Sequence, residues 1–479
     1  MRAGGNFAWA ALALLFCGAG CSVGPKYQRP SAPTPPAYSD NGHNGDWKHA
    51  QPQDAANRGS WWRIYGDDQL DQLEQRCATS NQSLLAAAEA YQQAHDLVLI
   101  AKSSLYPSIS ISPSLSRSKF SQTNPLLPPN IPLTFWNFLI PVNISWEPDF
   151  WGSIHRQIQA SQAGAQASAA DMANMRLSLQ GLLATTYLQL RGVDLQTQLL
   201  RKMVDANEDT LRLTRERYRV GLDNRSDVEL AVAQLQQVRA ELVDLGVQRA
   251  QEEHAIAVLV GVPASGFHLA EDPLAGEPPS IPTGIPSELL ERRPDIAATE
   301  RNVASVNALI GVAESAYYPN VMLGAGGGVQ SDRITELMHK GSTTWDGAVT
   351  ANEVIFEGGL RRAQVAEALA QRAQAVALYR EQVLSAFRDV EDQLGTLRVL
   401  AQETEQQQQA VDAATVGTQL ADERFRHGLG NYLEVLTDQT IELQDEQVAA
   451  ALLTRRMLAT AQLSISLGGG WNASQLPAN

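Results

Sequence analysis

The sequence predicts a mixed α+β chain that is mainly helical and is built from two similar halves. The first observation is that the 23 prolines leave two long gaps, Pro148–Pro263 and Pro319–Pro477. Both gaps are rich in Ala, Gln, Leu and Arg, with apolar residues at helical spacing. Because proline breaks helices, each gap can hold a helix of roughly 60 residues, about 90 Å long. Helices of that length form a coiled-coil tube or rod, not a single globule. The second observation is that short segments before each gap alternate with the period of β-strands.

The composition narrows the possible functions. Hydrophobic residues make up 44% of the 479 residues, but aromatic residues only 6%, as expected for long helices that pack through small side chains. The net charge of -15 makes nucleic acid an unsuitable partner, since phosphate binding requires a basic face. After the first 20 residues, no run of about 18 apolar residues predicts a transmembrane helix.

Residues 1–20 have the pattern of a lipoprotein signal peptide. Arg2 supplies the charged start and Phe7–Phe16 the apolar core, and small residues precede Cys21. Cys21 is therefore the predicted lipid attachment site, carrying an S-diacylglycerol and an N-acyl chain. The competing Cys17 follows the bulky Phe16, which suits the signal peptidase poorly. Such a lipid anchors a protein to a membrane without spanning it.

Removal of the signal peptide and lipidation of Cys21 leave Cys77 as the one remaining thiol of the three cysteines. A lone thiol forms neither an intramolecular disulfide nor a metal cluster. We therefore expect Cys77 to be a small buried residue of a helix.

An internal repeat accounts for the two halves. The segments Glu216–Leu222 (ERYRVGL) and Glu423–Leu429 (ERFRHGL) lie 207 residues apart (423 − 216 = 207). Further matches at similar offsets are Gly261 with Gly468, Phe150-Trp151-Gly152 with Phe356-Glu357-Gly358, and Tyr106-Pro107 with Tyr318-Pro319. Each half is therefore predicted to contain a helix, two strands, a long helix, a turn and a further helix.

Gly221 and Gly428 are predicted to form the turns at the tips of the two helical hairpins. Each follows a basic last turn of a helix, where glycine commonly adopts the left-handed C-cap conformation. Ser226-Asp227 is expected to start the next helix in the first half, and Asn431 to cap it in the second. Both tips lie far from the strands along the chain.

Four segments alternate between apolar and polar residues. They are Ser108–Ser116, Trp136–Trp146, Asn320–Val329 and Trp345–Asn352. Ser, Asn, Gly and Thr dominate the polar faces, and Trp residues lie near strand ends, as in transmembrane β-barrels. An ordinary soluble sheet is the alternative for any one strand. Four strands cannot close a barrel, and open edges in lipid leave backbone groups unpaired, so a membrane-spanning sheet requires an oligomer.

The two loops between the paired strands differ in character. Arg117–Thr134 contains four prolines, whereas Ser331–Thr343 is polar and of mixed charge. Long loops of such barrels lie outside the cell. The helices are then expected in the periplasm, on the same side as the lipid on Cys21.

Several motifs together resemble one protein family. They are GPKYQRP at Gly24–Pro30, Trp61-Trp62 before Tyr65-Gly66-Asp67, EPDFWG at Glu147–Gly152, PSELLERRPDI at Pro286–Ile296, FEGG at Phe356–Gly359 and LGGGW at Leu467–Trp471. With these motifs the chain resembles the outer-membrane factor (TolC-like) family. Within that family it is similar to the lipoprotein branch of OprM- and NodT-type efflux channels of RND systems. The resemblance covers nearly the whole mature chain.

The resemblance implies a homotrimer in the outer membrane of a Gram-negative bacterium. Three chains would form one 12-stranded transmembrane β-barrel, continued by a periplasmic α-helical coiled-coil barrel. The implied partners are a periplasmic membrane-fusion adaptor and an inner-membrane RND pump, with the channel as the passive exit for drugs or other small toxic molecules. The alternatives are a duct for type I protein secretion and a lipid-tethered structural coiled-coil rod.

The expected organisation of the chain follows from these features. The signal peptide (1–20) is followed by a lipidated strap (21–66), a first repeat (67–262) with a hairpin at about 107–149, and a linker (263–286). A second repeat (287–470) with a hairpin at about 319–356 and a short tail (471–479) complete the chain.

The sequence contains no pattern typical of a catalytic or metal-binding site. The eight His residues show no metal-ligand spacing, and Gly324–Gly328 lies in a predicted strand and lacks the helix of a nucleotide-binding loop. We therefore predict no enzyme activity, no metal and no cofactor other than the covalent lipid. Four residues of the family motif, Arg292, Arg293, Pro294 and Asp295, are expected to be structural, pairing with carboxylates or backbone at the start of a helix.

The resemblance places a gate just after the second hairpin tip, with an apolar and an acidic ring. Leu433 matches the apolar position. The acidic position is displaced by one residue, because the family has Asp-Ala-Gln where this chain has Thr437-Asp438-Gln439. Glu434 and Asp438 are the candidates, and Thr440 stands where the family often has an Arg. The alternative is that both carboxylates lie on a solvated helix face.

Overall fold

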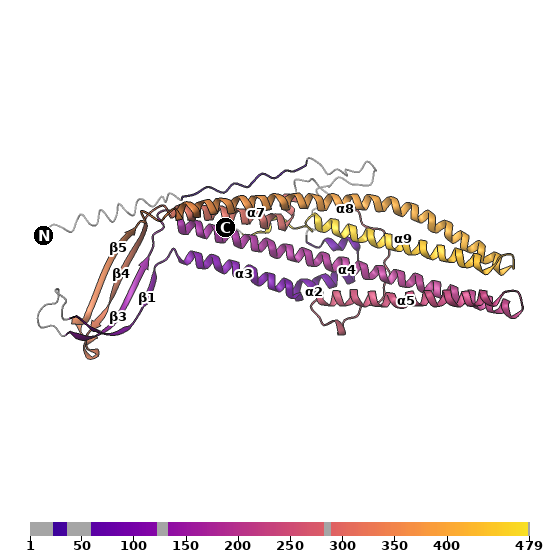
Figure 1. Cartoon of the computed structure of the whole chain (residues 1–479), viewed down its shortest axis with the longest axis horizontal. Helices are drawn as coiled ribbons and strands as arrows, with labels where there is room; N and C mark the ends of the chain where they lie inside the picture. The colour runs from indigo at the N-terminus through magenta and orange to yellow at the C-terminus, as the bar shows by residue number, and fades with distance from the viewer. Residues whose placement is uncertain (1–22, 36–58, 122–132, 282–288, 478–479) are drawn as a thin grey trace.

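A computed structural model of the chain describes residues 23–35, 59–121, 133–281 and 289–477. The body is elongated, with a β-sheet at one end and the tips of two long helical hairpins at the other (Figure 1). The predicted signal peptide and Cys21 lie outside the described residues.

The prediction of a mainly helical chain is confirmed, and the helices of the two halves correspond in length. The matching pairs have 22, 67 and 35 residues: α3 (Gln82–Ser103) with α7 (Pro294–Ser315), α4 (Ser153–Arg219) with α8 (Leu360–Arg426), and α5 (Arg225–Leu259) with α9 (Tyr432–Ser466). The remaining helices are α2 (Asp68–Ser80), α6 (Leu289–Arg292) and the short 3₁₀ turns Trp61–Tyr65, Ala264–Gly266, Ile334–Glu336, Lys340–Ser342 and Ala473–Gln475.

Local side chains fix where these helices begin. The Asp67 carboxylate accepts hydrogen bonds from the first turn of α2, and Asn81 caps α3 in the same way. Pro294 occupies the first position of α7, where its missing N–H leaves no helical bond unmade. The predicted start of α5 at Ser226-Asp227 is shifted, because Asn224 is the N-cap residue and Asp227 accepts a hydrogen bond from its backbone N–H.

The sheet is antiparallel throughout. Its strands are β1 (Ser108–Ile111), β2 (Ser114–Lys119), β3 (Thr134–Trp146), β4 (Asn320–Ser331) and β5 (Thr343–Asn352). Both β1 and β2 pair with β3, which pairs with β4, which in turn pairs with β5. The predicted first strand is therefore divided, because Pro113 has no backbone N–H to donate. Its register continues across the break, so the sheet has four rows.

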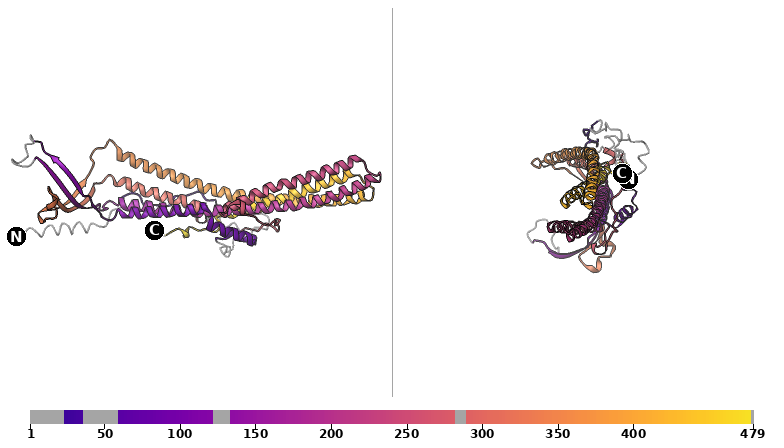
Figure 2. Two further views of the ribbon diagram at one scale, coloured as in Figure 1. Left: turned by 90° about the horizontal axis from the view of Figure 1, so that it is seen from below. Right: turned by 90° about the vertical axis from the view of Figure 1, so that its right-hand side faces the viewer.

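Helix α4 is the central element of the helical body. It packs against α3, α5, α7 and α9, and α8 packs against both α7 and α9. Figure 2 shows the hairpins running side by side away from the sheet. The largest apolar core lies midway along the body and includes Leu70, Tyr187, Leu190 and Ile256, all essentially inaccessible to solvent. Cys77 is buried in this core, as predicted.

A buried group of charges fixes the segment after α5 to the helices. Asp194 accepts hydrogen bonds from Arg191 at 3.0 Å and from Arg249 at 2.8 Å, and Arg249 also donates to Glu253 at 2.7 Å. The backbone N–H of Asp272 donates to Asp194. We refer to Arg191, Asp194, Arg249 and Glu253 as the equatorial charge network.

None of the helices in the described parts of the chain is both long enough and apolar enough to cross a bilayer.

Candidate functional site

One face of the sheet carries apolar residues from all four rows. The register places Ile109 opposite Ile144, Ile144 opposite Ala325, and Leu323 opposite Val349. Ile109, Ile144 and Val349 are exposed, Leu323 is partly exposed, and Trp345 on β5 is 86% exposed. An apolar face of this width that no part of the described chain covers is suited to lipid.

The opposite face of the sheet is mostly polar and carries Gly324, Gly326 and Gly328 of β4. Gln330 donates a hydrogen bond to Asn137 at 2.9 Å on this face. A Cβ at Gly326 would lie 2.4 Å from an Asp346 oxygen, and one at Gly328 would lie 2.3 Å from the Ile140 carbonyl oxygen. The glycines therefore allow close approach of polar groups and backbone on the face that would border a water-filled lumen.

The two hairpin tips have the same backbone geometry. Gly221 and Gly428 have φ values of 81° and 76°, in the left-handed region that glycine adopts without strain. In each tip, the residue after the glycine donates its N–H to a carbonyl five residues back, Leu222 to Arg217 and Leu429 to Arg424. These are Schellman turns, which satisfy the last carbonyls of α4 and α8.

Arg217 at the first tip joins the two hairpins. Its guanidinium lies 4.5 Å from the centre of the Phe425 ring and donates to the Phe425 carbonyl at 3.0 Å. It also pairs with Asp223 at 2.9 Å, and both side chains are largely buried. No feature of the sequence indicates this contact, apart from the matching of Arg217 with Arg424 in the predicted repeat.

The second tip has a different ion pair. Arg424 donates to Glu434 at 2.6 Å, and the two side chains are 55% and 35% exposed. Asn431 caps α9 by accepting from the Glu434 N–H at 2.9 Å. Glu434 is therefore held close to its own hairpin turn by Arg424.

The other two gate candidates differ in exposure. Leu433 is 61% exposed, and Asp438 is half-buried, one turn further along α9. No hydrogen bond or ion pair links the side chain of Asp438 to another described residue. Thr440 donates its hydroxyl to the Leu436 carbonyl at 2.7 Å. Within one chain the structure thus brings Leu433 and Glu434 to the tip surface but gives Asp438 no lock.

A small apolar core holds the four helix ends together just behind the tips. It contains buried residues from both hairpins: Leu211, Ala231, Leu235, Ala421, Phe425, Tyr432 and Val435. Burial raises the pKa of the Tyr432 hydroxyl to about 12. Any movement of one tip relative to the other therefore has to disturb this core.

The family motif at the start of α7 lies at the middle of the body. Arg293 donates to Asp295 at 2.6 Å, to Asp389 on α8 at 3.4 Å and to the Ser466 carbonyl at the end of α9 at 3.2 Å. A Cβ at Gly468 would lie 2.1 Å from the Arg292 carbonyl oxygen, so the chain passes here without room for a side chain. Pro294 is buried at the same junction. These contacts join α7, α8 and α9.

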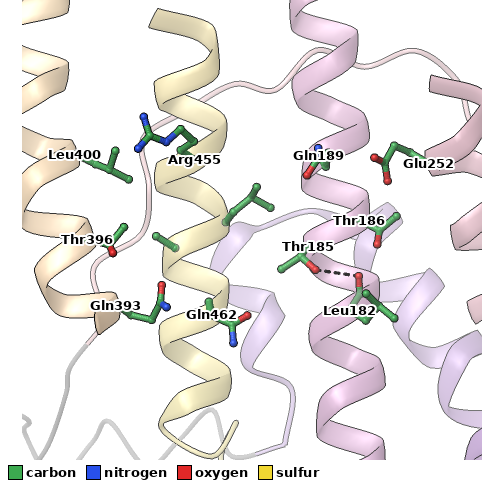
Figure 3. Close-up of a pocket in the computed structure, with 12 residues that line it drawn as sticks. Leu182, Thr185, Thr186, Gln189, Glu252, Gln393, Thr396, Leu400, Arg455 and Gln462 are labelled. Carbon is green, nitrogen blue, oxygen red and sulfur yellow. Dashed lines mark hydrogen bonds between the residues drawn. The ribbon is translucent and has the colours of Figure 1, made fainter. Parts of the chain in front are cut away.

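A cavity of about 540 Å³ with both polar and apolar walls opens between the two hairpins (Figure 3). Thr185 and Gln189 of α4 face Gln393 of α8 and Gln462 of α9 across it, with Glu252 and Arg455 at its border. Burial raises the pKa of the Glu252 carboxyl. Among the described residues, no group of three or more His, Cys, Asp or Glu could hold a metal ion.

Known proteins match this arrangement over most of the chain. The family model described as outer membrane efflux protein matches residues 73–262 and 285–469. The pyoverdine export outer membrane protein OpmQ of Pseudomonas aeruginosa is 29% identical over 438 residues, covering 90% of this chain and 91% of OpmQ. The probable outer membrane lipoprotein SilC of Salmonella typhimurium is 26% identical and covers 96% of this chain and 98% of SilC.

The same fold occurs in solved structures. The outer-membrane channel OprN superimposes with a TM-score of 0.85 at 26% identity, covering 94% of this chain and all of the OprN chain. The family and the outer-membrane location inferred from the sequence motifs are thereby confirmed. The chain belongs to the outer membrane efflux protein family and has the fold of its TolC-like channels.

Proposed function

We propose that three copies of this chain form the exit duct of a tripartite efflux system of the RND type. The duct would pass drugs or other small toxic molecules passively from the periplasm to the exterior. The observation that carries this proposal is the sheet with two open edges. The strands β1 and β2 pair only with β3 and β5 only with β4, so that both outer rows lack a partner within the described chain. Because unpaired backbone groups are costly in lipid, neighbouring copies are needed to close the sheet.

The resemblance to TolC-like channels supports three as the number of copies. Three chains with four rows each give the 12-stranded barrel inferred for TolC-like channels, with the polar face of the sheet lining the lumen. The equal lengths of the paired helices support an internal duplication, in which each half supplies one pair of rows and one hairpin to the assembly. The proposed repeats are residues 67–262 and 287–470.

A lipid on Cys21 would anchor each copy beside the barrel. The backbone N–H of Val23 donates to the Trp151 carbonyl, and Arg156 donates to the carbonyls of Val23 and Gly24. These contacts fix the chain just after Cys21 to the start of α4, next to the end of β3. The described part of the strap then follows α7 and α8, where Arg380 donates to the Ser31 carbonyl.

The gate is proposed at the helix tips, which point away from the sheet. Around a threefold axis, Leu433 would form an apolar ring, and Glu434 or Asp438 an acidic one. Three carboxylates in a narrow ring repel one another and attract cations. The same tips would receive the periplasmic adaptor, which links the duct to the inner-membrane pump.

Conductance across a planar bilayer tests the duct. Purified full-length protein is expected to produce discrete current steps with a preference for cations. A matched Cys21→Ser protein, reconstituted from detergent, should conduct in the same way, because the lipid anchors the chain but does not line the lumen. Trimers that insert into the bilayer without conducting would contradict the proposal.

A further inference from the structure

One helix contact in the first half of the chain differs from the equivalent contact in the second half. We call the contact between α3 and α4 the first seam and that between α7 and α8 the second seam. The offsets between the repeats place Gln180 of the first seam at the position of Phe387, and Arg176 at that of Val383. On the shorter helices, Leu84 corresponds to Ile296.

The second seam is filled by its own side chains. Tyr379, Val383 and Phe387 of α8 are buried in one apolar cluster with Ile296 and Val303 of α7. Residues of the strap and the linker pack against the same cluster. In the second seam, side chains of the chain itself therefore occupy the space between the two helices.

The first seam instead contains a cavity of about 690 Å³. A volume of this size is within the range of small-molecule sites in proteins, about 300–1,000 Å³. Its walls are largely apolar, with side chains from α3, α4 and the C-terminal tail: Leu84, Tyr91, Met172, Leu177, Trp471 and Leu476. It therefore has room for an alkyl chain where the second seam has Phe387 and Val383.

Two donors on α4 give the cavity a polar end. Gln180 is only 6% exposed, lines the cavity and has a side-chain Nε2 without a hydrogen-bond partner. A buried donor without a partner destabilises the folded chain, and a bound acceptor would remove this loss. Arg176 lies one turn before it on the same helix and also lines the cavity, and no hydrogen bond or ion pair joins its guanidinium to another described residue. The unmatched groups are therefore an N–H donor and a cation.

Glu74 of α2, an acid that interacts electrostatically with Arg176, does not cancel this charge. Glu74 is completely buried, and burial raises the pKa of its carboxyl to about 9. Asp71 contributes to this increase, and the smaller opposing effect of Arg176 does not reverse it. Glu74 is therefore neutral at pH 7 and leaves the Arg176 charge available for an anion.

We propose that the first seam binds a free amphiphile with one carboxylate and an alkyl chain, a ligand of the fatty-acid class. The carboxylate accepts hydrogen bonds from Gln180 and Arg176, and the chain fills the apolar part of the cavity. Leu84 is separated from the sheet by nearly all of α3, about 30 Å of helix, so a bilayer around the sheet does not reach the cavity. The occupant is accordingly a free molecule and not a membrane lipid.

Photo-crosslinking of the full-length protein tests the proposal. The probe is dodecanoate with a diazirine on its chain, applied to protein held in amphipol, so that detergent does not compete. Adducts are expected in the peptides that contain Met172–Leu177 and Trp471–Leu476. The matching quaternary-ammonium amphiphile is expected to label these peptides at least about tenfold less, because it repels Arg176 and offers Gln180 no acceptor.

The second seam supplies the matched variant. Arg176→Val combined with Gln180→Phe introduces the residues of the second seam and is expected to reduce labelling by about tenfold or more. Arg212→Val removes an exposed cation from the same helix, far from the cavity, and should label like the native protein. Arg176→Gln, at an exposed position, tests the charge alone if the double variant does not fold, and a loss of several-fold is expected.

The proposal is overturned if the native protein gives no adducts at these peptides, since a neighbouring copy or another segment of this chain then fills the seam. Equal labelling by the cationic amphiphile, or undiminished labelling of Arg176→Gln, would also overturn it. Neither result tests the proposed duct, which is tested separately by the conductance measurement.

Discussion

The two hairpin tips share a backbone but not their side-chain contacts. Both end a 67-residue helix in a glycine Schellman turn. At the first tip, Arg217 is buried over the Phe425 ring of the other hairpin and paired with Asp223. At the second tip, the equivalent Arg424 forms a half-exposed pair with Glu434 of its own hairpin. The first tip is thus fixed to its neighbour, whereas the second can release its ion pair at lower cost, which suits the gate proposed there.

The same asymmetry occurs in the middle of the body. The equatorial charge network of the first half includes Asp194 and Glu253, both buried. At the equivalent positions the second half has Ala401 and Thr460. Removing one partner from such a buried network is costly, and the second half has no charged residues at these two positions.

Removal of Asp194 should have the largest effect. Asp194→Ala leaves Arg191 and Arg249 buried without their shared carboxylate, which is expected to lower the free energy of unfolding by about 3–5 kcal/mol. Unfolding followed by helical circular dichroism measures the change. Glu271→Ala, which breaks the half-exposed pair with Arg201, is the control and should cost less than about 1 kcal/mol. Equal losses of unfolding free energy in the two variants would mean that the network contributes no more to stability than a half-exposed ion pair does.

Glu74, in the first half of the chain, should make the free energy of unfolding depend on pH. Its carboxyl has a pKa of about 9 in the folded chain, against 4.5 as the ordinary value. Between these values the folded state retains a proton that the unfolded state has released, so stability falls as pH rises, by about 1.4 kcal/mol per pH unit. Below pH 4.5 both states are protonated and the stability is fully present.

Replacement of this carboxyl tests the assignment. From pH 6 to pH 8 the native protein should lose about 3 kcal/mol more than Glu74→Gln, which keeps the shape of the side chain without its proton. Unfolding midpoints at the two pH values provide the measurement. Identical pH profiles for the two proteins would show that Glu74 is ionised in the folded chain.

The two tip arginines allow a direct comparison of the tips. Arg217→Met should cost about 2 kcal/mol, since it removes a largely buried ion pair, a bond to the Phe425 carbonyl and the ring contact. Arg424→Met should cost less than about 1 kcal/mol, because its pair with Glu434 is half-exposed. Hydrogen exchange of the tip amides should increase widely in the first variant and only near residue 431 in the second. If Arg424→Met instead cost more stability than Arg217→Met, the second tip would be the more firmly fixed of the two.

The smallest structural effect is expected from the gate candidate Asp438. Asp438→Ala should leave stability unchanged, because no described residue pairs with it, yet it should raise conductance or lower cation selectivity by opening the acidic ring. Single-channel recordings in asymmetric salt provide both quantities. If neither changes, Asp438 does not line the gate, and Glu434→Ala combined with Arg424→Met becomes the next variant to record.

The long helices and the faces of the sheet were predictable because their signals are local. Proline gaps, glycine turns and period-two alternation each depend on neighbouring residues, and Gly221, Gly428 and Asn431 all occupy the expected turns. The division of the first strand at Pro113 and the cap at Asn224 were missed, although both signals are also local. These errors concern the boundaries of elements, not their existence.

Contacts between distant segments were not predictable. Arg217 over Phe425 requires the two hairpins to lie side by side, and the equatorial charge network requires the segment 264–274 to fold back onto α4 and α5. The cavity of the first seam depends on the C-terminal tail meeting α3. The gate depends on other copies of the chain, so a single sequence supplies candidates without their arrangement.

The most direct test of the central claim is the molar mass of the protein extracted with detergent, measured by light scattering with the detergent subtracted. The open edges of the sheet predict about three chains of 52.0 kDa or slightly less per particle. A Cys21→Ser protein that is monomeric and stable without detergent would contradict this claim. The four rows of strands would then never enter lipid, and the chain would not form a channel.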